Sequence, residues 1–194
     1  YDKINTLSDI DITHIEYCKD IKALVVVYSN ANIDILFDDE EVYNITDFKN
    51  KSLPDKRING VDVQGTTAYI STVFGVVELD LEEYEFTNTY TTGLNTYCTY
   101  LFNGTLFCGT ETGMYSCGID KNLLDKNNWV KKNNYFTKAI CELDGMLYCY
   151  LDEFGIYSYN ASNKMEYLVN AEWNGYDAYT CSAPVTEAGT YTLN

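Results

Sequence analysis

Residues 104–115 read Gly-Thr-Leu-Phe-Cys-Gly-Thr-Glu-Thr-Gly-Met-Tyr. A short, mostly apolar run leads into a polar turn that ends at Gly113, and a second apolar run follows. This pattern predicts two antiparallel strands joined by a tight turn. Such a turn needs one or two residues at positive φ, which glycine adopts without a Cβ clash and asparagine tolerates better than most residues. The stretch therefore predicts a β-hairpin.

The hairpin pattern recurs along the chain, in residues 65–77 and 145–157 and in an earlier copy at 24–35. The second turn position falls at residues 32, 75, 113 and 155, and Asn32 stands where the other copies have glycine. A strand-rich repeat of about 40 residues is typical of β-propellers, in which each blade is a four-stranded antiparallel sheet. We therefore predict an all-β fold of about four and a half blades, near residues 13–46, 58–90, 96–133 and 137–169, with an incomplete fifth blade at 177–194.

An array that stops within a blade leaves an apolar blade face and strand edges uncovered. We therefore expect the chain to be a fragment of a larger propeller, or to form a homo-oligomer that covers the open faces. A small closed ring of four or five blades with irregular terminal pairing is the alternative.

Composition agrees with a strand-rich globular fold. The chain has 194 residues, of which 46% are hydrophobic, and it contains 19 Tyr, 8 Phe and only 2 Pro. Its longest apolar run, Ala23 to Tyr28, is far too short to cross a bilayer, so we expect no direct membrane insertion. The formal net charge of -16 argues against a nucleic-acid partner, because binding to phosphates relies on clustered Lys and Arg.

The seven cysteines include no Cys-x-x-Cys pair, and His14 is the only histidine. These residues predict no zinc site, and most of the cysteines lie in alternating apolar runs, where a reduced thiol behaves as a small buried hydrophobe. Centring the third hairpin between Thr112 and Gly113 places Cys108 opposite Cys117 across the ladder.

We find no sequence motif for catalysis. A glycine-rich phosphate loop and a Gly-x-Ser-x-Gly nucleophile motif are both lacking, so we predict no cofactor and no enzymatic activity. The acidic clusters at 38–41 and 80–83 are interpreted as solvated turns and not as Ca²⁺ sites, because they lack the ligand order of a calcium loop.

Several stretches closely resemble the N-terminal propeller of PorZ-like proteins: residues 7–9, 26–34, 56–60 and 68–80, then 109–115, 122–125 and Trp129. These are envelope proteins of Bacteroidetes that are associated with the type IX secretion system and related to two-component regulator propellers. The resemblance covers roughly residues 3 to 160. Ala31, where the family commonly has glycine, and the many cysteines depart from it. It implies further blades, a location in the periplasm or at the cell surface, and a scaffold or recognition role without catalysis.

A recognition propeller would bind a protein or a surface glycan through loops at one end, where Tyr and Trp side chains offer flat faces. Candidate contact residues are Tyr90, Trp129, Tyr135 and Trp173, although each could instead pack between blades. Two alternatives are kept: the ligand-sensing periplasmic part of a two-component regulator, and a carbohydrate-active propeller enzyme with paired carboxylates.

Overall fold

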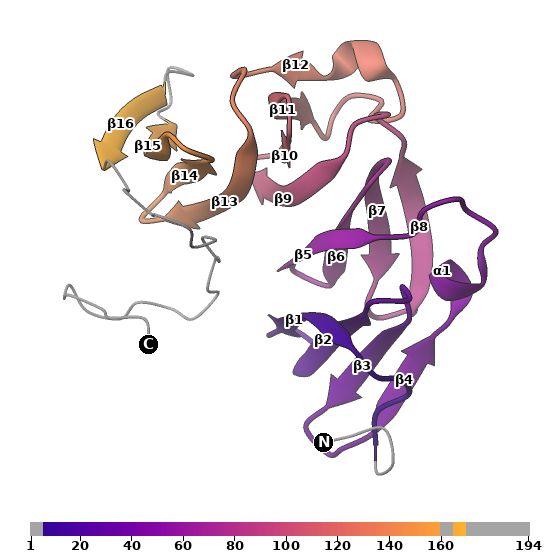
Figure 1. Cartoon of the computed structure of the whole chain (residues 1–194). Coiled ribbons are helices and arrows are strands. Elements are labelled where there is room, and N and C mark those ends of the chain that lie inside the picture. The colour runs from indigo at the N-terminus through magenta and orange to yellow at the C-terminus, as the bar shows by residue number, and fades with distance from the viewer. Residues whose placement is uncertain (1–5, 160–164, 170–194) are drawn as a thin grey trace.

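The computed structural model describes residues 6–159 and 165–169, which form four antiparallel sheets of four strands each (Figure 1). The first sheet holds β1 (Ile12–Cys18), β2 (Ala23–Tyr28), β3 (Ile33–Phe37) and β4 (Val42–Ile45), and the second holds β5 (Ile58–Gln64), β6 (Thr67–Thr72), β7 (Gly75–Asp80) and β8 (Glu85–Tyr90). The third holds β9 (Thr96–Phe102), β10 (Thr105–Thr110), β11 (Gly113–Gly118) and β12 (Val130–Lys131), and the fourth holds β13 (Thr137–Leu143), β14 (Met146–Leu151), β15 (Gly155–Tyr159) and β16 (Met165–Val169). The predicted all-β propeller class is confirmed.

Among the described residues, helical structure is limited to two short segments, α1 (Asp47–Asn50) and the 3-10 turn η1 (Lys126–Asn128). Over the described part of the chain, no helix has the length and hydropathy needed to cross a bilayer. The predicted fifth blade, residues 177–194, lies outside the described residues.

The blades follow one another in an arc. The first strands of successive blades, β1, β5, β9 and β13, lie side by side at the inner edge, and the last strands lie toward the outside (Figure 1). Over the described residues the arc does not close, which is at odds with a ring of four blades (Figure 1).

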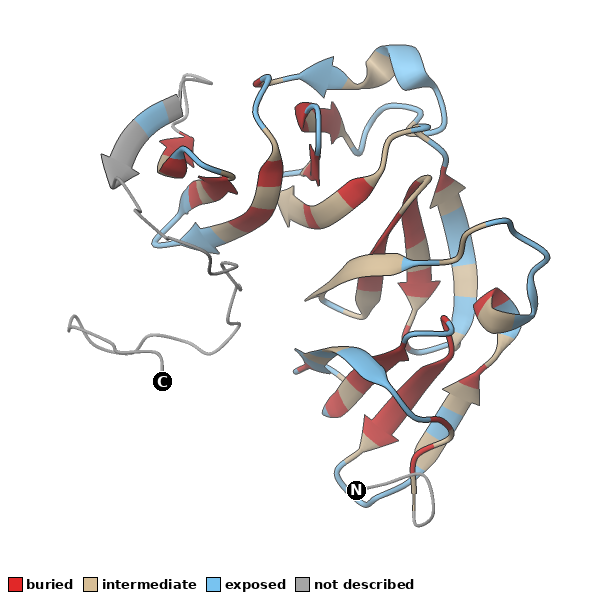
Figure 2. Ribbon diagram, viewed as in Figure 1, coloured by how far each residue is buried: buried red, intermediate tan, exposed pale blue. Residues whose placement is uncertain are grey.

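Three apolar cores hold the arc together, one in each seam between blades. Side chains alternate between the two faces of a strand. On β2, Val25 and Val27 therefore face the second blade, whereas Val26 faces away from it into a separate apolar cluster. Figure 2 shows the buried residues concentrated along the two middle strands of the blades. The outward face of the first blade carries exposed Ile15 and Tyr17 on β1.

Glycine is required in the hairpin turns where backbones approach closely. Gly75 and Gly113 have φ of 144° and 146°, and a Cβ added to Gly75 would lie 2.0 Å from the carbonyl oxygen of Tyr90. In the first blade the prediction that Asn32 supplies the positive φ is wrong, since Ala31 does so with φ of 64°. The side chain of Asn32 instead accepts a hydrogen bond of 3.0 Å from Asn44.

The predicted register of the third hairpin is also wrong. Cys108 pairs with Tyr115, and Cys117 pairs with Leu106, because the turn residues are Glu111 and Thr112 and the centre of the hairpin lies between them. Cys108 and Cys117 are therefore diagonal neighbours, and both are free thiols. Both are buried, and desolvation raises the pKa of Cys108 well above its usual range.

Candidate functional site

The turns between the second and third strands of every blade lie on the same side of the arc. Because the strands alternate in direction, the connections from each blade to the next also lie on this side, which we call the turn end. The inner strands begin here, so the turn end offers side chains from several blades to a partner.

Two pairs of aromatic rings lie at the turn end of the third and fourth blades. Tyr97 and Phe136 pack edge to face with ring centroids 4.7 Å apart, and Tyr135 and Phe154 pack in a tilted pair at 4.5 Å. Tyr135 and Phe136 are consecutive, which joins the two pairs into what we call the aromatic ridge. Tyr135 and Phe154 are each 45% exposed, so the ridge presents apolar surface to solvent.

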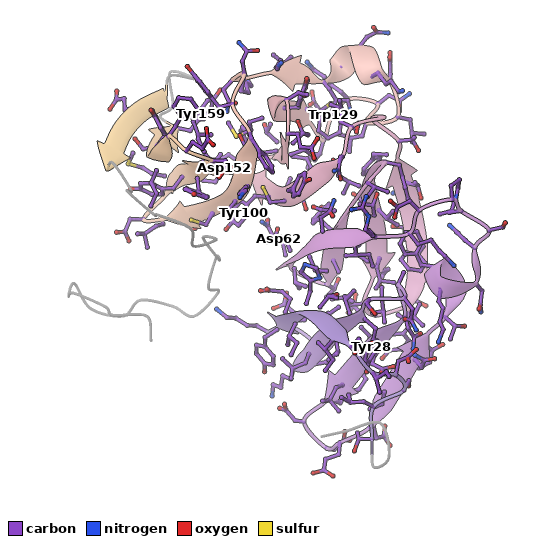
Figure 3. All side chains as sticks on the ribbon, viewed as in Figure 1. Tyr28, Asp62, Tyr100, Trp129, Asp152 and Tyr159 are labelled. Atoms are coloured by element: carbon purple, nitrogen blue, oxygen red, sulfur yellow. The ribbon has the colours of Figure 1, made fainter. Side chains whose placement is uncertain are left out.

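Residues of the fourth blade contact Phe136 of the aromatic ridge. The carbonyl of Phe136 accepts a hydrogen bond of 2.9 Å from the backbone amide of Asp152, and the carboxylate of Asp152 lies 3.2 Å from the ammonium of Lys138. That ammonium also lies 5.4 Å from the centre of the Phe136 ring. Figure 3 shows Asp152 within the fourth blade. These contacts hold Phe136 in place before any partner arrives.

At its other end the ridge joins a polar network between the second and third blades. The Tyr97 hydroxyl donates to Glu111, and the side-chain amide of Asn95 donates to both, at 3.0 Å to Tyr97 and 3.2 Å to Glu111. Asn59 of β5 donates to the side-chain oxygen of Asn95 at 2.7 Å. Burial, and then the nearby Glu111 carboxylate, raise the pKa of Tyr97, so it stays a neutral donor.

The predicted contact residues lie in four different settings. Tyr135 belongs to the aromatic ridge, and Trp129 is half-buried beside a pocket in the outer part of the third blade (Figure 3). Tyr90 is not the exposed aromatic that we expected, because it is only 6% exposed and packs with Tyr69 in the core between the second and third blades. Trp173 lies outside the described residues.

Sequence reasoning missed Tyr97, Phe136 and Phe154. Phe154 lies in the turn between β14 and β15, and Phe136 comes directly before β13. Both positions fall at the turn end of any antiparallel meander, so a search for aromatics in those turns and connections would have identified them. Tyr97 lies within a strand, and only the packing against Phe136 distinguishes it.

His14 and the acidic cluster at residues 80–83, which the sequence singled out, make local contacts in the structure. The Nδ1 atom of His14 lies 3.0 Å from the Thr13 hydroxyl, and burial lowers the pKa of the imidazole. Among the residues that the structure describes, no group of three or more His, Cys, Asp or Glu side chains is placed to hold a metal ion. Asp80, from one of the acidic clusters, accepts hydrogen bonds from the backbone amides of Glu82 and Glu83 and so stabilises its own turn.

Comparison with known proteins gives one family match. The model for the N-terminal β-propeller domain of PorZ, of the type IX secretion system, matches residues 1–130. None of the curated proteins matches the chain in sequence.

Among solved structures, PorZ of Porphyromonas gingivalis superposes with a TM-score of 0.78 at 28% sequence identity, covering 88% of this chain and 24% of that one. It is described as an essential bacterial surface component of the type IX secretion system. The extracellular domain of a putative hybrid two-component system from B. thetaiotaomicron superposes with a TM-score of 0.61 at 20% identity, covering 84% of this chain and 22% of that one. The chain thus spans about a quarter of the length of these proteins.

Proposed function

Because the chain belongs to the family of N-terminal β-propeller domains of PorZ, from the type IX secretion system, we propose that it is a non-catalytic recognition module of an extracytoplasmic scaffold. Family membership confirms the resemblance inferred from the sequence. We place the protein in the periplasm or at the cell surface, which agrees with the description of the solved PorZ as a bacterial surface component.

The aromatic ridge is the surface through which we propose that this module binds a partner protein. The observation that carries the proposal is the Tyr135 and Phe154 pair, in which each residue is 45% exposed yet the two rings pack against each other with centroids 4.5 Å apart. Large exposed rings in fixed positions are favourable contacts, because they bury much apolar area and lose little conformational entropy.

A surface glycan is the competing ligand for the same ridge, since aromatic faces also stack on sugar rings. We favour a protein because the Asp152 and Lys138 charges lie next to Phe136 of the ridge, where they can meet charged groups of a partner.

Site-specific photocrosslinking in the bacterium tests this proposal. A photoreactive phenylalanine analogue replaces Phe154 in the full-length protein, and the matched control places it at Tyr43, which is 47% exposed on β4 of the first blade. We expect a discrete envelope-protein adduct from position 154 that is absent from position 43 and is lost when Tyr135→Ala is added. Adducts of the same kind from both positions, or an adduct unaffected by Tyr135→Ala, would contradict a specific contact at the ridge.

Ligand sensing is the second candidate function, because structurally similar extracellular domains belong to signalling systems. At 20% and 13% identity these similarities support the shared fold alone. A membrane span followed by a kinase domain in the full-length gene would favour sensing over a scaffold role.

A further inference from the structure

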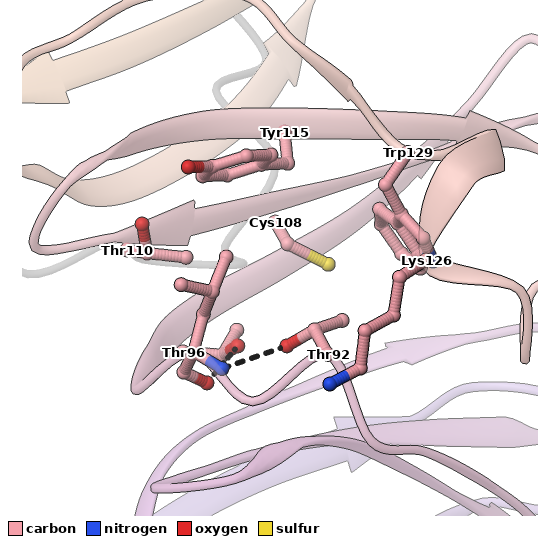
Figure 4. A pocket seen from close by; sticks show the side chains of 8 residues that line it. Thr92, Thr96, Cys108, Thr110, Tyr115, Lys126 and Trp129 are labelled. Carbon is pink, nitrogen blue, oxygen red and sulfur yellow. Dashed lines mark hydrogen bonds between the residues drawn. The ribbon is translucent and has the colours of Figure 1, made fainter.

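A pocket of about 200 Å³ opens on the third blade, beside the connection that leads into it from the second blade (Figure 4). Its walls come from the connection between β8 and β9, from β9, β10 and β11, and from η1 and the residue that follows it. The lining residues are Thr92, Leu94, Thr96, Cys108, Thr110, Tyr115, Lys126 and Trp129.

The wall that carries Lys126 and Trp129 is an unusually long connection. The third and fourth strands of the third blade are joined by residues 119–129, whereas residues 38–41 and 81–84 join them in the first and second blades. The long connection is well fixed: the Asp125 carboxylate accepts a hydrogen bond of 3.0 Å from the Asn127 amide, and the Trp129 indole donates to the carbonyl of Leu123 at 2.9 Å. The pocket wall is therefore preorganised.

Two polar groups converge at the mouth of the pocket. The ammonium of Lys126 reaches across to the β8 to β9 connection, where a Cβ added to Gly93 would lie 3.2 Å from it. The Thr92 hydroxyl borders the same pocket, as Figure 4 shows. That hydroxyl accepts a hydrogen bond of 3.2 Å from the backbone amide of Leu94 and keeps its own O–H as a donor. A cation and a hydroxyl donor that line one pocket suit a carboxylate.

The other hydroxyls in the pocket are already engaged. Thr96 donates to the carbonyl of Leu94 at 3.3 Å, and Thr110 donates to the carbonyl of Gly113 at 2.8 Å. Few free hydroxyl donors are thus left for the oxygens of a sugar, while the Trp129 and Tyr115 rings and Leu94 supply an apolar wall. This chemistry favours a flat apolar ligand with one anionic end.

We propose that this pocket binds a small aromatic carboxylate, with its ring against Trp129 and Leu94 and its carboxylate between Lys126 and Thr92. In a chain of net charge -16, a cation presented at a preformed apolar pocket selects an anionic ligand. The site is separate from the aromatic ridge and does not depend on the proposed protein partner.

Amide chemical-shift titration of the ¹⁵N-labelled chain with phenylacetate tests the proposal. We expect saturable shifts at Thr92, Gly93 and the Trp129 indole, with a dissociation constant in the range of about 0.1–5 mM, as a single-ring ligand allows. The neutral isostere phenylacetamide should bind about ten-fold more weakly, because it cannot pair with the ammonium.

Two lysine variants make the test specific to the pocket. Lys126→Met should weaken phenylacetate binding about ten-fold and remove most of the preference over phenylacetamide, and Lys126 is exposed, so we expect the fold to be kept. Lys121→Met, on the same connection but outside this pocket, should bind like the parent chain. Equal shifts from both ligands, an equal loss in both variants, or no saturable shift up to about 20 mM would overturn the proposal.

Discussion

The hydroxyl of Tyr28 donates a hydrogen bond of 2.6 Å to the carboxylate of Asp34, and both side chains are buried in the first blade. Asp34 also accepts hydrogen bonds from the backbone amide of Ser8 at 2.8 Å and from the side chain of Asn44 at 2.7 Å. One buried carboxylate thus ties β2, β3, β4 and the segment before β1 together.

Tyr28→Phe should destabilise the protein by about 1–2 kcal/mol, because it removes one of the donors to a buried carboxylate and leaves the packing volume nearly unchanged. Urea denaturation at neutral pH measures the loss. Tyr43→Phe, which removes a hydroxyl from an exposed ring, is the control and should change stability little. Equal effects from the two variants would contradict a special role for the Tyr28 and Asp34 contact.

Lys49→Met should cost about 1–2 kcal/mol near pH 7. The Lys49 ammonium lies 2.7 Å from the Asp9 carboxylate, and the hydrogen bonds from Lys49 and Asn30 hold the pKa of Asp9 well below its usual value. Because the pKa of Asp9 is lower in the folded protein than in the unfolded chain, where it is about 3.8, its carboxylate stabilises the fold above pH 3.8. This stabilisation is lost as the pH falls. The difference between variant and parent should therefore be largest above about pH 4 and shrink toward pH 2. A difference that does not change with pH would count against the ion pair.

Asp62→Asn should stabilise the protein at alkaline pH. Burial raises the pKa of Asp62 to about 7, although Gln64 donates a hydrogen bond of 2.9 Å to its carboxylate. Figure 3 places Asp62 at the inner edge of the arc, and the charge of Glu16 adds to the shift. Because the pKa of Asp62 is higher in the folded protein than in the unfolded chain, where it is about 3.8, the protonated carboxyl stabilises the fold fully below pH 3.8. This stabilisation is lost as the pH rises through 7.

At about pH 8 the Asp62→Asn variant should therefore unfold at higher urea than the parent chain, by about 2 kcal/mol, and near pH 4 the two should agree. Paired urea titrations at the two pH values give the comparison. A variant that is less stable than the parent at pH 8 would refute this assignment.

Gly75→Ala should destabilise the second blade by about 3 kcal/mol or more, because the new Cβ would lie 2.0 Å from the carbonyl oxygen of Tyr90 at a φ of 144°. Gly104→Ala is the matched control: Gly104 has φ of 68° and nothing lies within 4 Å of an added Cβ, so the cost should be about 1 kcal/mol. Thermal unfolding of both variants measures the contrast, and similar losses would mean that backbone crowding at Gly75 is unimportant.

The hairpins were predictable because their signals are local. Alternating apolar residues and a glycine such as Gly113 lie within a dozen positions of one another, and the geometry of a two-residue turn follows from those positions alone. The register was harder to predict, since Thr-Glu-Thr-Gly admits two turn centres. Moving the centre by one position changes the cross-strand partner of Cys117 from Cys108 to Leu106.

The first hairpin differed because distant residues shape its turn. Asn30 donates to Asp9, and Asn32 contacts Asn44, so the turn is a longer loop in which Ala31 takes the positive φ. The same reason explains Tyr90, whose burial depends on the third blade packing over it.

From residue order alone follow the strands, the repeat of about 40 residues and the family of the chain, because periodicity and turn chemistry act over short distances. Residue order alone does not show which aromatic rings come into contact. The aromatic ridge joins Tyr97 of the third blade to Phe154 of the fourth, and the pocket joins the connection after β8 to η1. Such contacts depend on how blades stack and where a long connection folds back, so only the assembled arc brings these side chains together.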